Sequence, residues 1–374
     1  LESFYECEYR FFAGFGLRLQ EREVYGIDPM MTGSLFHDAL DRFLKAVNAI
    51  GTDLADLSTQ EREELIEGLL KEIFGEPQYG VLASSARMNY LRHRLGKTVS
   101  KMTWALQQQQ QKTRLRPVKT EVAFGEIAGK PGFPGINLPL SNGGTLKVRG
   151  KIDRIDVAQA DGKTWLAVVD YKSGDKSFSL LEAYYGLAMQ LITYLDVALQ
   201  DAEALIGTDE VRPAGAYYMC IQDPVLKPEE ALQNQLLSKY RMKGFYLKDG
   251  SLFAEMDDTP EPKGTSQLFP LTRDVKGVLK NSAQTKTFYT DEEIQVLRQF
   301  NRKKMQNAAE RIVTGELALN PFLAPNGKRA CSFCPFRSAC SFDVMLKEND
   351  YHRLVNQSQE ALFTDMKEGD SNAE

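Results

Sequence analysis

The sequence predicts an α/β fold, because segments with helical periodicity and segments with strand periodicity alternate along the chain. Residues 33–50 carry apolar side chains at helical spacing, and over residues 117–160 the hydrophobic period changes to two. A strongly amphipathic helix is expected at 179–200 and a further buried strand at 211–222. The order helix, strands, helix, strand is typical of α/β proteins.

The length and composition of the chain limit the classes of protein to which it can belong. With 374 residues, 43% of them hydrophobic, the chain is long enough for one large or two medium cores. The formal net charge is −5, so contacts with nucleic acid must come from local basic patches. There is no apolar run of about 18 residues and no signal-peptide pattern, which predicts a cytoplasmic location. The start at Leu1, followed by residues that read as core, predicts a fragment of a longer polypeptide.

The first helix, 33–50, has Ser34 as its expected N-cap and His37 in its first turns. Residues 58–112 are polar and helical in pattern, and we expect a helical insertion over about 50–116. The strands that follow therefore begin the predicted core, at about 117–222.

A hairpin is predicted in the middle of the chain. Asp161-Gly162 separates two strand-like segments, GKIDRIDVAQA and KTWLAVVDYK, and is a strong signal for a two-residue turn. With this turn, Ala160 pairs with Lys163, and every later pair of the hairpin follows from that one. A Pro- and Gly-rich loop is expected at 129–144, before the hairpin.

Two carboxylates face each other near the open end of this hairpin. The register places Asp153 opposite Asp170 and Lys151 opposite Lys172, and side-chain alternation puts Asp170 and Lys172 on one face. Directly opposed side chains have Cβ atoms roughly 4.5–5.5 Å apart, and like charges there destabilise a sheet. A hard divalent cation between the carboxylates accounts for the arrangement. The alternative is an ordinary surface strand that carries a charged pair.

The remaining segments complete the predicted organisation. Residues 223–287 lack a clear period, so we expect an irregular insertion there. Thr290 and Glu293 form a capping box that opens a helix running to about Gly315. We expect a single domain over 1–365, followed by a flexible tail at 366–374.

The Asp153, Asp170-x-Lys172 pattern resembles the signature of the PD-(D/E)-x-K nuclease superfamily. Three further motifs, GSLFHDAL, GKIDRID and YYGLAMQLITYLD, narrow the resemblance to its RecB-like branch. The resemblance implies a restriction-endonuclease-like core, in which a mixed sheet is flanked by helices. It also implies phosphodiester hydrolysis that depends on Mg²⁺ or Mn²⁺.

The resemblance also assigns roles to individual residues. The implied metal ligands are His37, Asp153, Asp170 and the backbone carbonyl of Tyr171. Lys172 would orient the attacking water or stabilise developing charge. Gln190 and Tyr194 match the family's Q-x3-Y helix and either contact DNA or brace the site. Glu121 is either a helper carboxylate or a solvated strand residue, and a core or surface histidine is the alternative for His37.

Four of the five cysteines suggest a second site. Cys331, Cys334 and Cys340 form a C-x2-C-x5-C motif, Cys7 lies near the other end of the chain, and Cys220 reads as a buried strand residue. In a cytoplasmic protein such a group indicates a metal or iron–sulfur site rather than disulfides. The layout resembles the iron–sulfur nucleases, in which four thiolates hold a [4Fe–4S] cluster that joins the chain ends, here about 1–20 and 321–345. Zinc is the alternative.

The opening LESFYECEYRFFAGFGLRLQERE and the layout of the whole chain resemble the C-terminal nuclease domains of the AddB family. That resemblance implies a DNA exonuclease acting on the 5′-terminated strand during double-strand-break repair. It also implies an AddA-type helicase–nuclease partner that feeds single-stranded ends to the site. Two alternatives stay open: a stand-alone CRISPR-associated-type iron–sulfur nuclease, and a non-catalytic DNA-binding module that retains the cluster. Basic segments at 87–101, 112–119 and 302–304 either follow DNA phosphates or are merely solvated.

Overall fold

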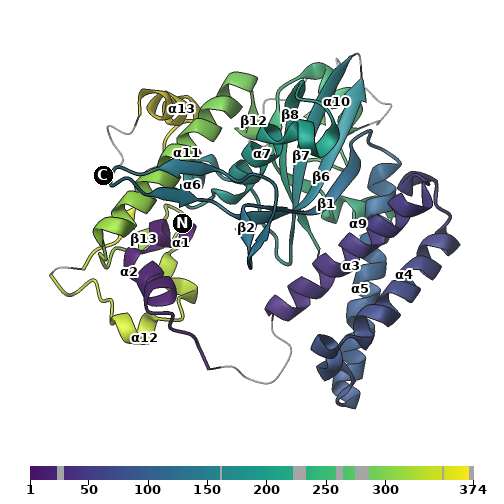
Figure 1. Cartoon of the computed structure of the whole chain (residues 1–374), viewed down its shortest axis with the longest axis horizontal. Helices are drawn as coiled ribbons and strands as arrows, with labels where there is room; N and C mark the ends of the chain where they lie inside the picture. The colour runs from purple at the N-terminus through teal and green to yellow at the C-terminus, as the bar shows by residue number, and fades with distance from the viewer. Residues whose placement is uncertain are drawn as a thin grey trace.

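A six-stranded mixed sheet forms the centre of the computed structural model (Figure 1). The described residues are 1–22, 29–160, 162–221, 233–257, 264–273, 286–347 and 349–369. In sheet order the strands are β1 (Arg116–Phe124), β6 (Gly150–Ala160), β7 (Lys163–Lys172), β8 (Val211–Cys220), β9 (Met242–Leu247) and β12 (Phe288–Tyr289). Neighbouring strands are antiparallel except for β7–β8 and β9–β12. The predicted α/β class with a mixed sheet is confirmed.

Helices flank this sheet in two groups. The helices α3 (Pro29–Ile50), α4 (Thr59–Gly75) and α5 (Ala86–Gln110) pack together and stand beyond β1 (Figure 1). Helix α7 (Gln190–Gln200) packs on β7 and β8, and α11 (Asp291–Thr314) packs on α7 and on α13 (Gln359–Glu368). No described helix combines the length and the apolar character needed to cross a membrane.

Shorter elements join the larger ones. The short helices are α1 (Glu2–Glu6), α2 (Glu8–Phe11), α6 (Leu180–Tyr184), α8 (Ala202–Ile206), α9 (Gln233–Lys239), α10 (Gly250–Met256) and α12 (Arg337–Cys340). The short strands are β2 (Glu126–Ile127), β3 (Lys130–Pro131), β4 (Asn137–Pro139), β5 (Thr145–Lys147), β10 (Gly264–Thr265), β11 (Thr272–Arg273), β13 (Phe322–Leu323) and β14 (His352–Arg353). The predicted loop at 129–144 therefore contains strands of two small hairpins, β2–β3 and β4–β5.

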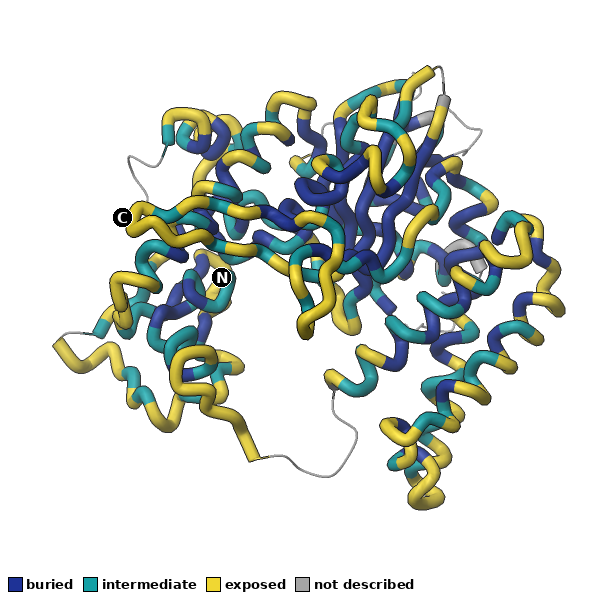
Figure 2. Tube along the Cα trace, in the orientation of Figure 1, coloured by how far each residue is buried: buried dark blue, intermediate teal, exposed yellow. Residues whose placement is uncertain are grey.

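Strand β7 lies in the most buried part of the sheet (Figure 2). Residues 165–171 are all buried, because neighbouring strands lie on both sides and other elements cover both faces. On the face opposite Asp153, the guanidinium of Arg154 makes two hydrogen bonds, of 2.8 and 2.7 Å, to the carboxylate of Asp156. Arg154 is fully buried, so this bidentate pair satisfies a charge that would otherwise be costly to enclose.

The predicted hairpin register is confirmed from Ala160–Lys163 to Arg154–Val169. Gly162 has φ +71°, the left-handed conformation that a tight two-residue turn requires, while Asp161 lies outside the described residues. The paired part of the hairpin ends one residue before Asp153 and Asp170, and the Lys151–Lys172 pair lies beyond it.

Two helix predictions need correction. Helix α3 begins at Pro29, so Ser34 lies inside the helix and does not cap it; proline suits the first helical turn, where no backbone donor is needed. The single helix expected at 179–200 is divided between α6 and α7. The division is at Gly186, which has φ +75° and packs so closely on the ring of Tyr5 that a Cβ would lie 2.3 Å from it.

Two further predictions about the later part of the chain were wrong. The segment expected to be an irregular insertion contributes β9 to the central sheet, and β9 shows no period of two because it is buried on both faces. Residues 223–232, 258–263 and 274–285 of that segment lie outside the described residues. The flexible tail does not begin at 366, since α13 continues to Glu368 and buries Met366. The helix predicted from Thr290 to Gly315 is confirmed, with its capping box.

Candidate active site

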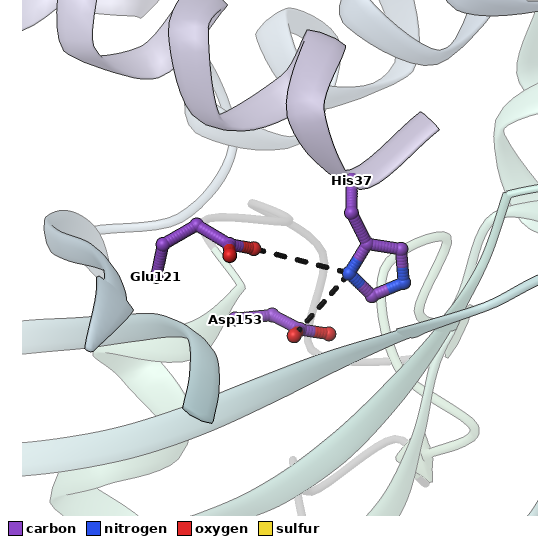
Figure 3. A group of neighbouring side chains, drawn as sticks. All are labelled: His37, Glu121 and Asp153. Atoms are coloured by element: carbon purple, nitrogen blue, oxygen red, sulfur yellow. Dashed lines mark ion pairs between the residues drawn. The ribbon is translucent and has the colours of Figure 1, made fainter. Parts of the chain in front are cut away.

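Three separate elements bring a histidine and two carboxylates together (Figure 3). His37 comes from α3, Glu121 from β1 and Asp153 from β6, and one ligand atom from each lies within 4.8 Å of the others. The Nδ1 atom of His37 is 3.3 Å from Asp153 Oδ1 and 3.9 Å from Glu121 Oε1. Glu121 therefore points into the group, which its place in the sequence left open.

The backbone of Tyr171 lies between His37 and Asp153. Its amide donates a 2.7 Å hydrogen bond to Asp153 Oδ2, and its carbonyl oxygen is 3.1 Å from His37 Nε2. This amide bonds to a side chain at the point where the regular β6–β7 pairing has ended. Three of the four groups expected to hold a metal, His37, Asp153 and the Tyr171 carbonyl, thus lie next to one another.

Asp170, the fourth expected ligand, is buried on β7, with 1% of its surface exposed. Its Oδ2 atom forms an ion pair with Lys172, two residues along the same face, but makes no hydrogen bond of regular geometry. Burial raises the pKa of Asp170 to about 6; the charge of Lys172 opposes this rise and that of Asp153 adds to it. Asp170 is thus a carboxylate held close to another carboxylate with little solvation.

Glu121 has a strained backbone conformation and a carboxyl group with a raised pKa. Its φ of +52° lies in the left-handed region, which costs a residue other than glycine about 1–3 kcal/mol and is concentrated at functional sites. Burial raises the pKa of Glu121, although Lys151 forms an ion pair with its carboxylate and opposes the rise. Burial lowers the pKa of His37, but Asp153 and Glu121 outweigh that effect and leave it raised.

The chemistry of this donor set fits a hard divalent cation. Carboxylate and carbonyl oxygens are the ligands that Mg²⁺ and Mn²⁺ prefer, and a single imidazole is compatible with Mn²⁺. The buried Oδ2 of Asp170, without a regular hydrogen bond, is the kind of acceptor that a cation would satisfy.

Helix α7 lies against this acidic group. The side-chain amide of Gln190 donates a 3.0 Å hydrogen bond to the hydroxyl of Tyr194, whose ring packs edge-on against Phe124. Burial raises the pKa of Tyr194, and the charges of Asp170 and Asp153 raise it further, so the phenol lies near these carboxylates. Glu2 accepts hydrogen bonds of 2.6 and 3.0 Å from the backbone amides of Met189 and Gln190. No sequence signal indicated this contact with the first residues of the chain.

The four cysteines of the second predicted site line one cavity: Cys7, Cys331, Cys334 and Cys340. Cys7 is buried and packs with Phe322 and Leu354, in a small apolar cluster separate from the main core. Burial raises the pKa of Cys331, and the neighbouring thiols of Cys334 and Cys340 raise it further. Cys220 does not line this cavity and is half-buried at the end of β8. The chain ends therefore meet around four thiols, near α1, α2 and α12 (Figure 1).

Tyr218 is a neighbour of this site that sequence reasoning missed. It is the Cα partner of Asp170 in the parallel β7–β8 pairing. Only the alternation of buried residues along 211–222 could have indicated its face, and nothing in the sequence indicates which strand lies beside β7.

Comparisons with known proteins agree with this geometry. The model of the PD-(D/E)XK nuclease superfamily matches residues 1–341. The chain is similar to proteins named as the B subunit of an ATP-dependent helicase/deoxyribonuclease, with 45% identity over 366 residues in Enterococcus faecalis, 36% over 360 in Lactiplantibacillus plantarum and 34% over 389 in Latilactobacillus sakei. These alignments cover 97%, 95% and 100% of this chain but 30%, 30% and 32% of the relatives, so the chain spans about a third of their length. The resemblance noted in the sequence is confirmed: the chain belongs to the PD-(D/E)XK nuclease superfamily.

Proposed function

We propose that this chain is a metal-dependent DNA exonuclease domain of a helicase–nuclease, acting on the 5′-terminated strand. The observation that carries the proposal is the convergence of His37, Asp153, Asp170 and Lys172 at the open end of one hairpin, in a member of a nuclease superfamily. The described chain up to Glu368 would act as a single nuclease domain.

The proposed roles follow from position and charge. A cation held by His37, Asp153, Asp170 and the Tyr171 carbonyl, Mg²⁺ or Mn²⁺, would polarise the scissile phosphate and acidify a water. Lys172, whose side chain is partly exposed, would hold that water and stabilise the charge that develops on the phosphate.

Supporting residues hold this arrangement in place. The amide of Tyr171 fixes one oxygen of Asp153 and leaves the other directed at His37. The hydrogen bond between Gln190 and Tyr194 favours the bracing role for this pair over direct DNA contact. Glu121 would act as a helper carboxylate beside His37.

We further propose that Cys7, Cys331, Cys334 and Cys340 hold a [4Fe–4S] cluster. The four thiols line one cavity where the two ends of the chain meet, which supports a shared metal group. Four thiolates suit either zinc or an iron–sulfur cluster, and the C-x2-C-x5-C layout with Cys7 at the other end of the chain, which resembles the iron–sulfur nucleases, favours the cluster.

The three basic segments predicted from the sequence differ in how many of their charges are paired within the structure. Arg116 pairs with Asp53, and Arg302 makes a 2.5 Å hydrogen bond to the buried carboxylate of Asp196, so much of the charge in two segments is used internally. Helix α5 differs, because it carries five lysines and arginines and neither aspartate nor glutamate.

Along α5, the exposed residues Arg87, Tyr90, Arg94 and Lys97 follow each other at intervals of three and four and so share one face. The three cations make no ion pair with any residue in the described ranges. Such a face, with an exposed aromatic ring among the cations, suits the phosphates and bases of single-stranded DNA. We propose it as part of the DNA path.

A partner is proposed from the relatives. They are named as the B subunit of an ATP-dependent helicase/deoxyribonuclease, which supports an AddA-type helicase–nuclease subunit feeding DNA ends to this site during double-strand-break repair. The same names favour this assignment over a stand-alone CRISPR-associated-type nuclease. The complete set of acidic residues with Lys172 favours an enzyme over a non-catalytic DNA-binding module.

The test is cleavage of single-stranded DNA labelled at its 5′ end or at its 3′ end, with Mg²⁺ or with EDTA. An exonuclease acting from the 5′ terminus releases the 5′ label at once as a short product and shortens the 3′-labelled strand progressively, in Mg²⁺ only. DNA binding without cleavage in either condition would support the non-catalytic module. Degradation from the 3′ terminus would contradict the proposed polarity.

A further inference from the structure

Tyr218 lies beside Asp170, one of the carboxylates that the proposed function assigns to the metal. Asp170 and Tyr218 are Cα partners in neighbouring parallel strands, so their side chains leave the sheet on the same face. The next residue back, Tyr217, leaves from the opposite face and stacks on Tyr246, with ring centroids 5.0 Å apart. One strand thus presents two adjacent tyrosines, and only Tyr218 faces the proposed site.

The hydroxyl of Tyr218 is buried without a partner. The residue is 2% exposed, and its oxygen makes no hydrogen bond to any part of the chain that the structure describes. Buried polar groups in native proteins are nearly always hydrogen-bonded, so this hydroxyl has an unused capacity to bind a group that the chain does not supply. A tyrosine can donate one hydrogen bond through its O–H group.

The charges around Tyr218 define the kind of partner. The Nζ atoms of Lys172 and Lys176 lie 5.7 and 4.7 Å from the centre of its ring, so two cations border this position. Burial raises the pKa of Tyr218, and the charge of Asp170 raises it further, which keeps the phenol a neutral donor. A donor flanked by two lysines and close to a proposed cation site suits an anionic oxygen.

We propose that the phenol of Tyr218 donates a hydrogen bond to a non-bridging oxygen of the scissile phosphodiester, and is thus a further catalytic residue of this site. The proposal rests on the proposed nuclease function and adds a named contact to it. The hydrogen bond strengthens as negative charge accumulates on the phosphate oxygens, and the phenol keeps its proton throughout.

The chain supplies a matched control on the same strand. The hydroxyl of Tyr217 is also buried and also lacks a partner among the described residues, but the ionisable groups near it are Tyr246 and Asp156, outside the proposed site. Removing either hydroxyl leaves the aromatic ring in place. Because neither hydroxyl forms a bond that would be lost, Tyr218→Phe and Tyr217→Phe should both fold with unchanged or raised melting temperatures.

The test compares cleavage of single-stranded DNA by the wild-type chain, Tyr218→Phe and Tyr217→Phe in Mn²⁺. We expect kcat to fall about 10- to 100-fold in Tyr218→Phe and to remain unchanged in Tyr217→Phe, since loss of one such donor typically costs a factor of this order or more. Affinity for Mn²⁺, measured without DNA, should be the same in all three proteins.

Cleavage of a phosphorothioate substrate distinguishes direct contact between Tyr218 and the phosphate from a purely structural role of Tyr218. Sulfur accepts hydrogen bonds poorly, so replacing the oxygen that Tyr218 contacts should slow the wild type more than it slows Tyr218→Phe, for one of the two sulfur stereoisomers. Equal cleavage rates in wild type and Tyr218→Phe would overturn this proposal alone, as would equal effects of sulfur in both. Absence of metal-dependent cleavage in the wild type would overturn the proposed function and this inference with it.

Discussion

The imidazole Nε2 of His37 lies 3.1 Å from the backbone carbonyl oxygen of Tyr171, 134 residues further along the chain. This contact joins α3 to the end of the β6–β7 hairpin and closes one side of the proposed metal site. If both atoms bind the same cation, His37 contributes to metal affinity without contributing to the core.

His37→Ala should therefore weaken Mn²⁺ binding at least about tenfold and slow cleavage, while the fold and the cysteine site stay unchanged. Isothermal titration with Mn²⁺ measures the first effect, and the visible spectrum and melting temperature measure the second. His93→Ala is the control, because His93 is exposed on α5. If His37→Ala binds Mn²⁺ with wild-type affinity, His37 is not a metal ligand and has only a structural role.

The metal-free protein should lose stability as pH rises. The pKa of Asp170 is raised from 3.8 to about 6 in the folded chain, so the folded state holds a proton that the unfolded state has released. That stabilisation is complete below about pH 4 and is lost as pH rises through about 6; it corresponds to about 3 kcal/mol. The raised pKa of His37 acts in the same direction, since its charged form is favoured only below that pKa.

Metal must displace these protons, so the rise in melting temperature caused by Mg²⁺ should be larger at pH 8 than at pH 5. Thermal unfolding with and without Mg²⁺ at the two pH values measures this. In Asp170→Asn, which cannot ionise, the fall in metal-free stability with pH should be smaller. A Mg²⁺ effect that is independent of pH would contradict the assignment of these groups as ligands.

If the four cysteines hold a [4Fe–4S] cluster, anaerobically purified protein should be brown, with broad absorption at the violet end of the visible spectrum. Serine at Cys7, Cys331, Cys334 or Cys340 should remove the colour and lower the melting temperature, because the cluster joins segments far apart in the sequence. Cys220→Ser should keep the colour, since Cys220 lies outside the cavity. Colourless protein with stoichiometric zinc would contradict the cluster.

The exposed cations of α5 predict a salt-dependent contribution to DNA binding. Combining Arg87→Ala, Arg94→Ala and Lys97→Ala should weaken binding of single-stranded DNA and reduce the salt dependence of affinity by about 0.7 for each phosphate that is no longer bound. Helix stability should not suffer, because alanine favours helices at exposed positions. Lys71→Ala on the neighbouring helix α4 is the control. An unchanged salt dependence in the triple variant would place the DNA path elsewhere.

The sequence predicted the parts of the site that depend on local rules. The Asp161-Gly162 turn set the hairpin register as far as Arg154–Val169, and Asp153 and Asp170 are the next residues of the two strands. The roles of Glu121 and Tyr218 depend instead on which strands lie beside the hairpin. Tyr218 reaches Asp170 only after a crossover through α6, α7 and α8, and pairing over that distance leaves no pattern in either strand.

Other errors have local causes that only the packing explains. Gly186 divides a continuous amphipathic pattern because the ring of Tyr5, from the other end of the chain, occupies the space beside it. Strand β9 was missed because a strand buried on both faces loses the alternation by which strands are recognised.

Asp170→Ala removes a proposed ligand and should abolish cleavage. DNA binding should survive or become tighter, because one carboxylate near the phosphate path is gone. The folded state should tolerate the change, because ionisation of the buried Asp170 carboxyl group lowers the stability of the metal-free chain. Loss of folding in this variant, shown by circular dichroism, would contradict that view of the carboxylate.

The most direct test of the central claim is Lys172→Ala. Both carboxylates remain in this variant, so Mn²⁺ and single-stranded DNA should still bind, whereas cleavage should fall by about 10²–10³ because the charge on the phosphate is no longer stabilised. Lys163→Ala, at the exposed far end of the same strand, should cleave normally. Metal bound, DNA bound and little cleavage is the result that the account predicts. Cleavage at the wild-type rate in Lys172→Ala would contradict it and leave Asp170-x-Lys172 as an ordinary strand end.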